Sequence, residues 1–303
     1  MKLVVENLNK TYPNGIRALK NLSLTVYQGM FGLLGPNGAG KSTLMRTIAT
    51  LQEADSGTIT FGAIDVINDK QALRKVLGYL PQEFGLYPKI TAEKLLDHLA
   101  YLKGITNASQ RKNVINSLLH KTNLWAARNK NLGGFSGGMK QRFGIAQALL
   151  ANPQLIIVDE PTAGLDPSER NRFLNLLSEI GENTVVILST HIVDDVRELC
   201  PFMAIINNGE MLYKGKPADA IAQLNGKVWT KRVVNAELET HRREFNVVSE
   251  RLFAGVREIH VISESAPDGS FEGVPPGLED VYFGYISGSL KPYQLDYFAG
   301  SRE

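Results

Sequence analysis

Cysteine, long apolar runs and an excess of one charge are all scarce in this 303-residue sequence. The single cysteine, Cys200, excludes an intrachain disulfide and suits a reducing compartment. The 33 basic and 31 acidic side chains nearly cancel, so we expect no direct contact with nucleic acid. No stretch approaches the ~18 consecutive apolar residues of a membrane span. Any role at a membrane is therefore expected to depend on a partner.

A secretion signal is not expected either, because only Leu3, Val4 and Val5 precede Glu6 at the start of the sequence. The overall balance, 43% hydrophobic and 21% charged residues, is that of a globular protein.

Short apolar runs separated by turn residues predict the strands of an α/β fold. These runs are LVVENL, LSLTV, GTITF, VLGYL, LIIVDE, TVVILST and MAIINNGEMLY, the last with a hairpin signal at its NNG. Between VLGYL and LIIVDE, apolar residues recur at helical spacing and predict an inserted helical subdomain at about 84–151. After Gly226 the pattern changes to KVWTKRVV, AELETHRREF, NVVSERLF, REIHVISE and PPGLEDVYFGYI. We expect one large domain at 1–226 and a small α+β domain at 227–303.

The segment GPNGAGKST fits the phosphate-binding pattern G-x-x-x-x-G-K-[ST] and lies between the apolar run MFGLL and the helical TLMRTIATL. Glycines let backbone N–H groups converge on phosphates, and the start of a helix adds positive potential. Lys41 would reach the outer phosphates, and the Ser42 hydroxyl would ligate Mg²⁺. The predicted cradle comprises Gly35, Pro36, Asn37, Gly38, Ala39, Gly40, Lys41, Ser42 and Thr43.

A second chemical signal is LIIVDEP, an apolar strand that ends in Asp159 and Glu160. Open α/β sheets bind ligands at the carboxyl ends of their strands, so both acids are expected near the phosphates. Asp159 would hold Mg²⁺ through water, and Glu160 would be the general base for an attacking water. The alternative is a strand that ends in two solvated acids.

The order of the phosphate-binding loop, FSGGMKQR, LIIVDEPTAGLD and LSTH resembles the nucleotide-binding subunit of an ATP-binding-cassette (ABC) transporter over residues 1 to about 220. The resemblance implies an ABC-type ATPase core with an antiparallel β subdomain and a helical subdomain. It also implies a head-to-tail homodimer, in which Ser136, Gly137 and Gly138 contact the ATP bound by the partner copy. Phe135 and Met139 depart from the usual LSGGQ signature, and the missing glutamine removes one polar contact.

Four further positions match functional residues of that family. Tyr12 would stack on adenine, although an exposed tyrosine at a sheet edge is an open alternative. Gln82 would touch Mg²⁺ or the attacking water. Asp166 would cross the dimer interface or, alternatively, cap a helix. His191 would hydrogen-bond the γ-phosphate and orient Glu160.

The resemblance implies that the chain binds ATP and Mg²⁺ and hydrolyses ATP as a peripheral subunit at the cytoplasmic face of the cell membrane. Its partner would be a polytopic permease on a separate chain, docked in a groove around Glu83–Gly104. The leucines of LLDHLAYL either line that groove or form the core of the helical subdomain.

The C-terminal segment with GLEDVYFGYI resembles the appendage of ABC-2-type exporters, which favours export. Its aromatic residues either form a dimer contact or regulatory surface or fill a small core; they are Tyr282, Phe283, Tyr285, Tyr293, Tyr297 and Phe298. An importer subunit and a soluble cassette ATPase that acts on nucleic acid or ribosomes remain alternative interpretations. A scaffold without turnover would lack Glu160 or His191, and both are present.

Overall fold

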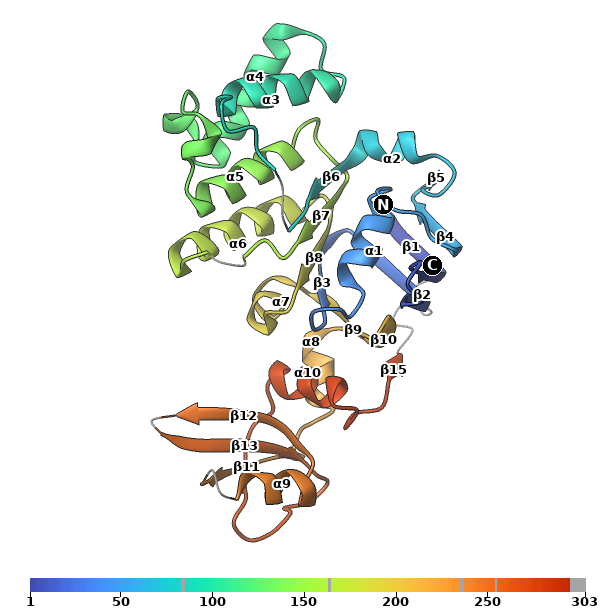
Figure 1. The fold of residues 1–303 in the computed structure, drawn as a ribbon, viewed down its shortest axis with the longest axis vertical. Helices are drawn as coiled ribbons and strands as arrows, with labels where there is room; N and C mark the ends of the chain where they lie inside the picture. The colour runs from blue at the N-terminus through green and yellow to red at the C-terminus, as the bar shows by residue number, and fades with distance from the viewer. Residues whose placement is uncertain (83–84, 163–164, 235–236, 254, 295–303) are drawn as a thin grey trace.

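A computed structural model describes residues 1–82, 85–162, 165–234, 237–253 and 255–294 and confirms the α/β fold (Figure 1). Its largest sheet has seven strands in the order β15-β10-β9-β3-β8-β7-β6. The strands are β3 (Gly29–Leu34), β6 (Leu77–Leu80), β7 (Leu155–Asp159), β8 (Val185–Thr190), β9 (Phe202–Asn207), β10 (Glu210–Gly215) and β15 (Tyr293–Gln294). The run from β9 through β3 to β6 is parallel, and β7 and β8 are buried along their whole length because helices or strands cover both faces.

A four-stranded antiparallel sheet, β2-β1-β4-β5, packs near one face of the large sheet. Its strands are β1 (Lys2–Thr11), β2 (Arg17–Tyr27), β4 (Ser56–Phe61) and β5 (Ile64–Asp65). Helix α1 (Lys41–Ile48) lies between the two sheets, where Leu44 and Ile48 share a core with Leu3 and Ile187. Helix α2 (Lys70–Val76) leads from this sheet into β6.

Helices α3 (Ala92–Leu102), α4 (Ala108–Lys121) and α5 (Gly137–Ala148) lie between β6 and β7, where the helical insertion is predicted. They begin at the capping residues Thr91, Asn107 and Ser136 and enclose a core of their own. Short 3₁₀ turns, Trp125–Ala127 and Leu132–Gly134, connect α4 to α5. Of the two interpretations of the LLDHLAYL leucines, core packing holds for Leu95 and Leu96, which are buried.

Helices α6 (Pro167–Gly181), α7 (Val193–Leu199) and α8 (Pro217–Ala222) follow β7, β8 and β10. Apolar residues of α6 and α7 pack on the face of the large sheet opposite α1. Within the described ranges, no helix combines the length and apolar character needed to cross a bilayer.

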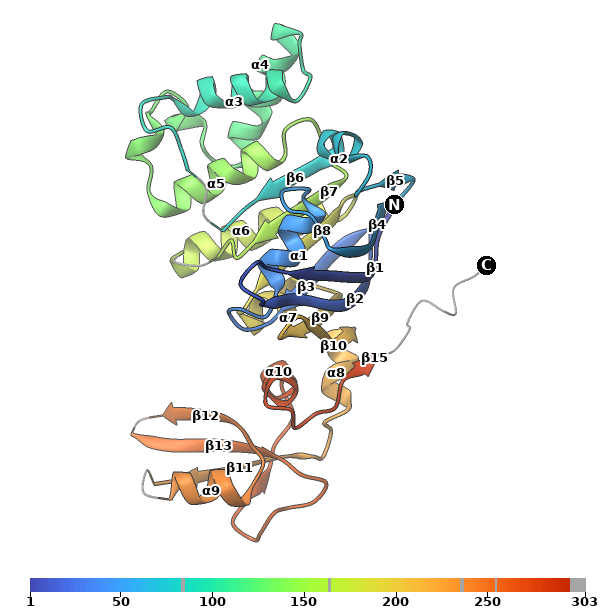
Figure 2. The same ribbon diagram turned by 45° about the vertical axis from the view of Figure 1, so that its right-hand side comes forward.

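Beyond Gly226 the chain forms a separate small sheet, β12-β13-β11-β14, at the end of the molecule opposite α3 and α4 (Figure 2). Its elements are β11 (Val228–Val233), α9 (Leu238–Glu244), β12 (Val247–Phe253), β13 (Val256–Ile262) and β14 (Glu272–Gly273). Helix α9 and this sheet share a core that includes Val233, Ile259 and Phe271.

The chain then returns to the large unit through α10 (Leu278–Ile286) and β15. Leu278, Val281 and Tyr285 join a core cluster with Tyr213 and Leu224. The rings of Tyr213 and Tyr285 are 5.7 Å apart between centroids. Apolar contacts therefore cross the boundary predicted after Gly226. Of the aromatics in the C-terminal segment, Tyr282 and Tyr285 belong to this shared core. Glu83, Tyr297, Phe298 and the side chain of Tyr293 lie outside the described residues.

Candidate nucleotide site

The parallel register brings three functional segments to one edge of the large sheet. Leu34 of β3 pairs with Thr190 of β8, and Asp159 of β7 pairs with Ser189 of β8. The next residue on each strand is Gly35, Glu160 or His191. The carboxyl ends of these strands therefore deliver the phosphate-binding loop, the acids and the histidine to one crevice, as the sequence predicts.

The loop from Gly35 to Gly40 is closely packed, and at its two ends only glycine fits without a steric clash. A Cβ at Gly35 would lie 2.4 Å from the carbonyl oxygen of Ile206. Gly40 has φ +109°, and a Cβ there would lie 2.5 Å from the carbonyl oxygen of Ala18. Lys41 begins α1 and donates from Nζ to the carbonyl oxygens of Gly35 (2.7 Å) and Pro36 (3.1 Å).

The ammonium group of Lys41 also forms an ion pair with Glu160. Its Nζ lies 3.4 Å from Glu160 Oε1, and both side chains are buried. Burial lowers the pKa of Lys41, because water is lost around the cation; the charges of Glu160 and Asp159 oppose that shift.

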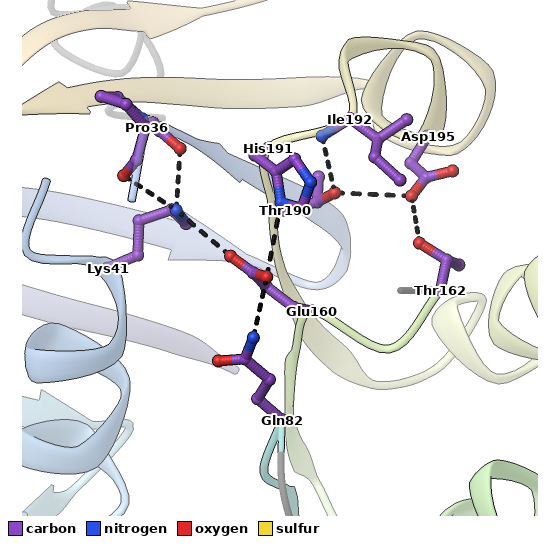
Figure 3. Close-up of polar contacts among 10 residues, drawn as sticks. Pro36, Lys41, Gln82, Glu160, Thr162, Thr190, His191, Ile192 and Asp195 are labelled. Carbon is purple, nitrogen blue, oxygen red and sulfur yellow. Dashed lines mark hydrogen bonds and ion pairs between the residues drawn. The ribbon is translucent and has the colours of Figure 1, made fainter. Parts of the chain in front are cut away.

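Three side chains converge on the Glu160 carboxylate (Figure 3). Gln82 donates from Nε2 to Oε2 at 3.1 Å, His191 Nδ1 lies 3.4 Å from the same oxygen, and Lys41 faces the other oxygen. The backbone of Glu160 has φ +47°, a left-handed conformation that is uncommon for a residue with a side chain. Its N–H donates to the Ser189 carbonyl oxygen at 2.9 Å, which keeps it next to β8.

Asp159 presents a buried carboxylate oxygen that accepts no hydrogen bond from the described part of the chain. Asp159 is 2% exposed, and neither its Oδ1 nor the neighbouring Ser189 hydroxyl has a hydrogen-bond partner among the described residues. Burial raises the pKa of the nearby Tyr79, and the negative charge of Asp159 adds to the shift. A buried, unpaired carboxylate oxygen fits water or a hydrated divalent cation. Ser42 and Gln82 are the other polar side chains here that could take part in holding Mg²⁺.

A cavity of about 990 Å³ opens beside the loop. It is bounded by Tyr12, Asn14, Gly15, Ile16, Arg17, Ala18, Lys20, Asn37, Gly38, Ala39, Gly40, Lys41, Ser42, Thr43, Gln82, Glu160, Asn208 and Gly209. The Tyr12 hydroxyl is tied to Thr43 Oγ1 and Gln52 Oε1, each at 3.0 Å, so its ring has a fixed place in the wall.

The β9–β10 hairpin forms part of this wall, which sequence reasoning missed. Gly209 donates its N–H to the carbonyl oxygen of Ala39 at 2.9 Å, and Asn208 lines the cavity. The NNG motif predicts the turn itself but not its place, because only the sheet order brings it to the phosphate-binding loop.

Ser136, Gly137, Gly138 and Asp166 do not line this cavity in the described part of the chain. Ser136 Oγ accepts from the N–H of Met139 at 3.3 Å and caps α5, and Asp166 Oδ1 accepts from the N–H of Glu169 at 2.9 Å and caps α6. The capping interpretation of Asp166 is therefore observed within one chain. Both helices have residues in the core on the face of the sheet opposite α1.

The sequence also gave no signal for a buried acid behind the site. Asp195 of α7 is 0% exposed and contacts Thr162 and Thr190, which flank the Glu160 and His191 segments (Figure 3). In the sequence it is one of two adjacent aspartates, Asp194 and Asp195, on a short helix and looks like a surface residue.

The site combines a phosphate-binding loop, a buried aspartate with one oxygen that accepts no hydrogen bond from the described residues, and a glutamate contacted by lysine, glutamine and histidine. Together these features define a nucleoside-triphosphate hydrolase site. Comparison with known proteins identifies the family to which the chain belongs. The family model described as "ABC transporter" matches residues 19–163. The chain belongs to the family of ABC transporter ATP-binding proteins and is an ATP hydrolase.

One relative, the "Uncharacterized ABC transporter ATP-binding protein YxlF" of Bacillus subtilis (strain 168), is 34% identical over 92% of this chain and 98% of its own length. The "Nod factor export ATP-binding protein I" of Rhizobium etli is 38% identical over 73% of this chain and 70% of its own length. A solved dimer of the ATP-binding cassette MJ0796 with ADP and Pi has a TM-score of 0.65 and 28% identity. The structural match covers 71% of this chain and 98% of the MJ0796 chain.

Proposed function

We propose that this chain powers an exporter whose membrane-spanning permease is a separate polypeptide. The observation that carries the ATP-driven part of this proposal is the set of contacts to Glu160, whose carboxylate meets Lys41, Gln82 and His191 within 3.1–3.4 Å. A chain that had lost turnover would not need this arrangement.

In the proposed site, ATP lies in the cavity beside the loop, with its adenine on Tyr12 and its phosphates among the backbone N–H groups from Gly35 to Thr43. Lys41 would release the carbonyl oxygens of Gly35 and Pro36 and pair with the outer phosphates. Ser42, Gln82 and, through water, Asp159 would hold Mg²⁺. The metal would supply positive charge that offsets the charge of the phosphates.

Hydrolysis is proposed to depend on Glu160 as general base. Its carboxylate would accept a proton from the attacking water, because it lies 3.4 Å from Lys41 at the end of the phosphate cradle. His191 would hold the γ-phosphate and fix the Glu160 side chain through the 3.4 Å contact. The position of Gln82 would change when nucleotide binds, because Gln82 contacts Glu160.

The complete site is proposed to need two copies of the chain. Ser136, Gly137, Gly138 and Asp166 lie outside the wall of the cavity, yet Ser136 begins a helix whose free N–H groups suit a phosphate. In a head-to-tail homodimer they would reach the ATP of the partner copy. The dimeric arrangement of the MJ0796 cassette supports this proposal.

The permease is proposed to dock on a groove between α3, α5 and β6. A cavity of about 420 Å³ there is lined by Leu51, Leu99, Leu102, Tyr79 and Lys103, among others. Leu51 is 62% exposed and Leu102 is 67% exposed, which is unusual for two leucines beside one cavity. The lining suits the apolar face of a short helix.

Export is favoured over import by the named role of the Rhizobium relative in Nod factor export. A soluble cassette ATPase acting on nucleic acid or ribosomes is the second candidate, and an importer subunit is the third.

The test is co-purification of tagged Glu160→Gln protein with ATP and Mg²⁺ from solubilised membranes of the host. We expect the variant to bind ATP without steady hydrolysis, because it keeps the shape of the side chain but loses the base, and to retain a polytopic membrane protein. Adding Leu102→Glu should release that protein, whereas Leu252→Glu, at a leucine 66% exposed on the small sheet, should not. Steady hydrolysis by Glu160→Gln would refute the catalytic assignment. Recovery of ribosomes or DNA-bound proteins instead would favour the soluble alternative.

A further inference from the structure

We infer that Asp195 is a positioning residue for hydrolysis, because its buried carboxylate ties the segment that carries Glu160 to the segment that carries His191. The inference rests on the roles proposed for Glu160 and His191. Asp195 itself is 0% exposed and does not line the nucleotide cavity, so it would act only through other residues.

A single oxygen of Asp195 faces two threonine hydroxyls (Figure 3). Thr162 Oγ1 donates to Asp195 Oδ2 at 2.7 Å, and Thr190 Oγ1 lies 3.4 Å from the same atom. Thr162 follows Glu160 after one proline, and Thr190 directly precedes His191. Asp195 therefore joins the two segments from behind the site.

The hydroxyl of Thr190 also shapes the turn around the histidine. It accepts the N–H of Ile192 at 2.9 Å, so its own proton is free to point toward Asp195 Oδ2. This hydrogen bond spans His191, and the direction of that side chain therefore depends on Thr190. Thr162 and Thr190 are 4% and 1% exposed, which leaves water little access to replace either contact.

The other oxygen of Asp195 is paired with a cation. Arg170 of α6 donates from Nε to Oδ1 at 2.8 Å, which keeps the buried charge neutralised and leaves Oδ2 for the two threonines. Asp195 thus connects α6, the segment after β7 and the end of β8.

Such a connection matters because Glu160 has a left-handed backbone with φ +47°. An uncommon conformation persists only where surrounding contacts enforce it. His191 Nδ1 lies 3.4 Å from Glu160 Oε2. A displacement of about 1 Å at a reacting group can lower the reaction rate by ~100-fold. Loss of the Asp195 contacts is therefore expected to lower turnover without changing the phosphate cradle.

The test compares Thr162→Val, which removes the hydroxyl at nearly constant shape, with Thr162→Ser, which keeps it. We expect kcat of Thr162→Val and of Asp195→Asn to fall by ~10–100-fold, as for other residues that orient catalytic groups, while ATP affinity stays within about 2-fold. Thr162→Ser should rescue most of the rate. Asp194→Asn is the matched control, because Asp194 precedes Asp195 on α7 but is only partly buried and pairs with Arg197. An unchanged kcat in Thr162→Val would overturn the inference.

A double-mutant cycle separates positioning from general structural support. In a His191→Ala background, Asp195→Asn should lower the single-turnover rate less than in the native background, because one of the two groups that it positions is gone. An equal fold-loss in both backgrounds would overturn the inference. If Glu160→Gln retains steady hydrolysis, the proposed function fails; if that variant is inactive while Thr162→Val is normal, only the inference about Asp195 fails.

Discussion

Lys41 is held in the nucleotide site by contacts that a phosphate group would replace. Its Nζ is bound to two backbone carbonyls of its own loop and lies 3.4 Å from Glu160. The same burial that lowers its pKa strips the cation of water, so a phosphate would compete for it with two neutral carbonyl oxygens and the Glu160 carboxylate.

Lys41→Ala should therefore weaken ATP binding by ~10-fold or more, about 1.4 kcal/mol. The measurement is the dissociation constant for ATP with Mg²⁺, from equilibrium titration of the purified chain. Lys70→Ala, which removes a partly exposed lysine paired with Glu53, serves as the charge control. An unchanged affinity in Lys41→Ala would contradict the proposed cradle.

The elements of the fold were largely predictable, because their apolar patterns are simple. β7 and β8 are continuous apolar runs that hardly fit any other structure, and the NNG turn of β9–β10 is a strong local signal. The place of that turn was not predictable, since its contact from Gly209 to Ala39 depends on strand order. Nor was the burial of Asp195 predictable, because it depends on partners from α6, β8 and the loop after β7 and leaves no periodic signal.

At the start of α5, one side chain is proposed to serve both the helix and the dimer. Ser136 caps the helix in the single chain, so Ser136→Ala should cost about 1 kcal/mol in the free energy of unfolding, as at other helix caps. The same change should impair ATP-dependent dimer formation more than ATP binding by the monomer.

Asn107→Ala supplies the comparison, because Asn107 caps α4 of the same subdomain with a 2.9 Å hydrogen bond to Gln110. It should show the loss of stability without the loss of dimers. Dimer formation by light scattering and unfolding by denaturant would be measured on both variants. Equal dimer formation by the two would argue against a composite site.

At the scale of the whole molecule, α10 fastens the C-terminal segment to the large unit. Leu278 is 2% exposed in the same core cluster as Tyr213, Leu224 and Val228. Leu278→Ala should therefore lower the free energy of unfolding by about 2–5 kcal/mol, the range for a leucine removed from a core. Leu252→Ala, at an exposed position of β12, should change it by less than about 0.5 kcal/mol. The melting temperatures of both variants, compared with that of the native chain, give the readout; a normal value for Leu278→Ala would show that α10 is only loosely attached.

The packing of α10 against earlier parts of the chain also means that one apolar core is completed late in translation. Tyr213, Leu224 and Val228 leave the ribosome before Leu278, with which they are finally buried. At ~5–20 residues per second, the roughly 50 residues between Val228 and Leu278 take about 3–10 s to translate. During that interval the nascent chain carries an uncovered apolar face, and this is the stage at which chaperone binding would protect it most from aggregation.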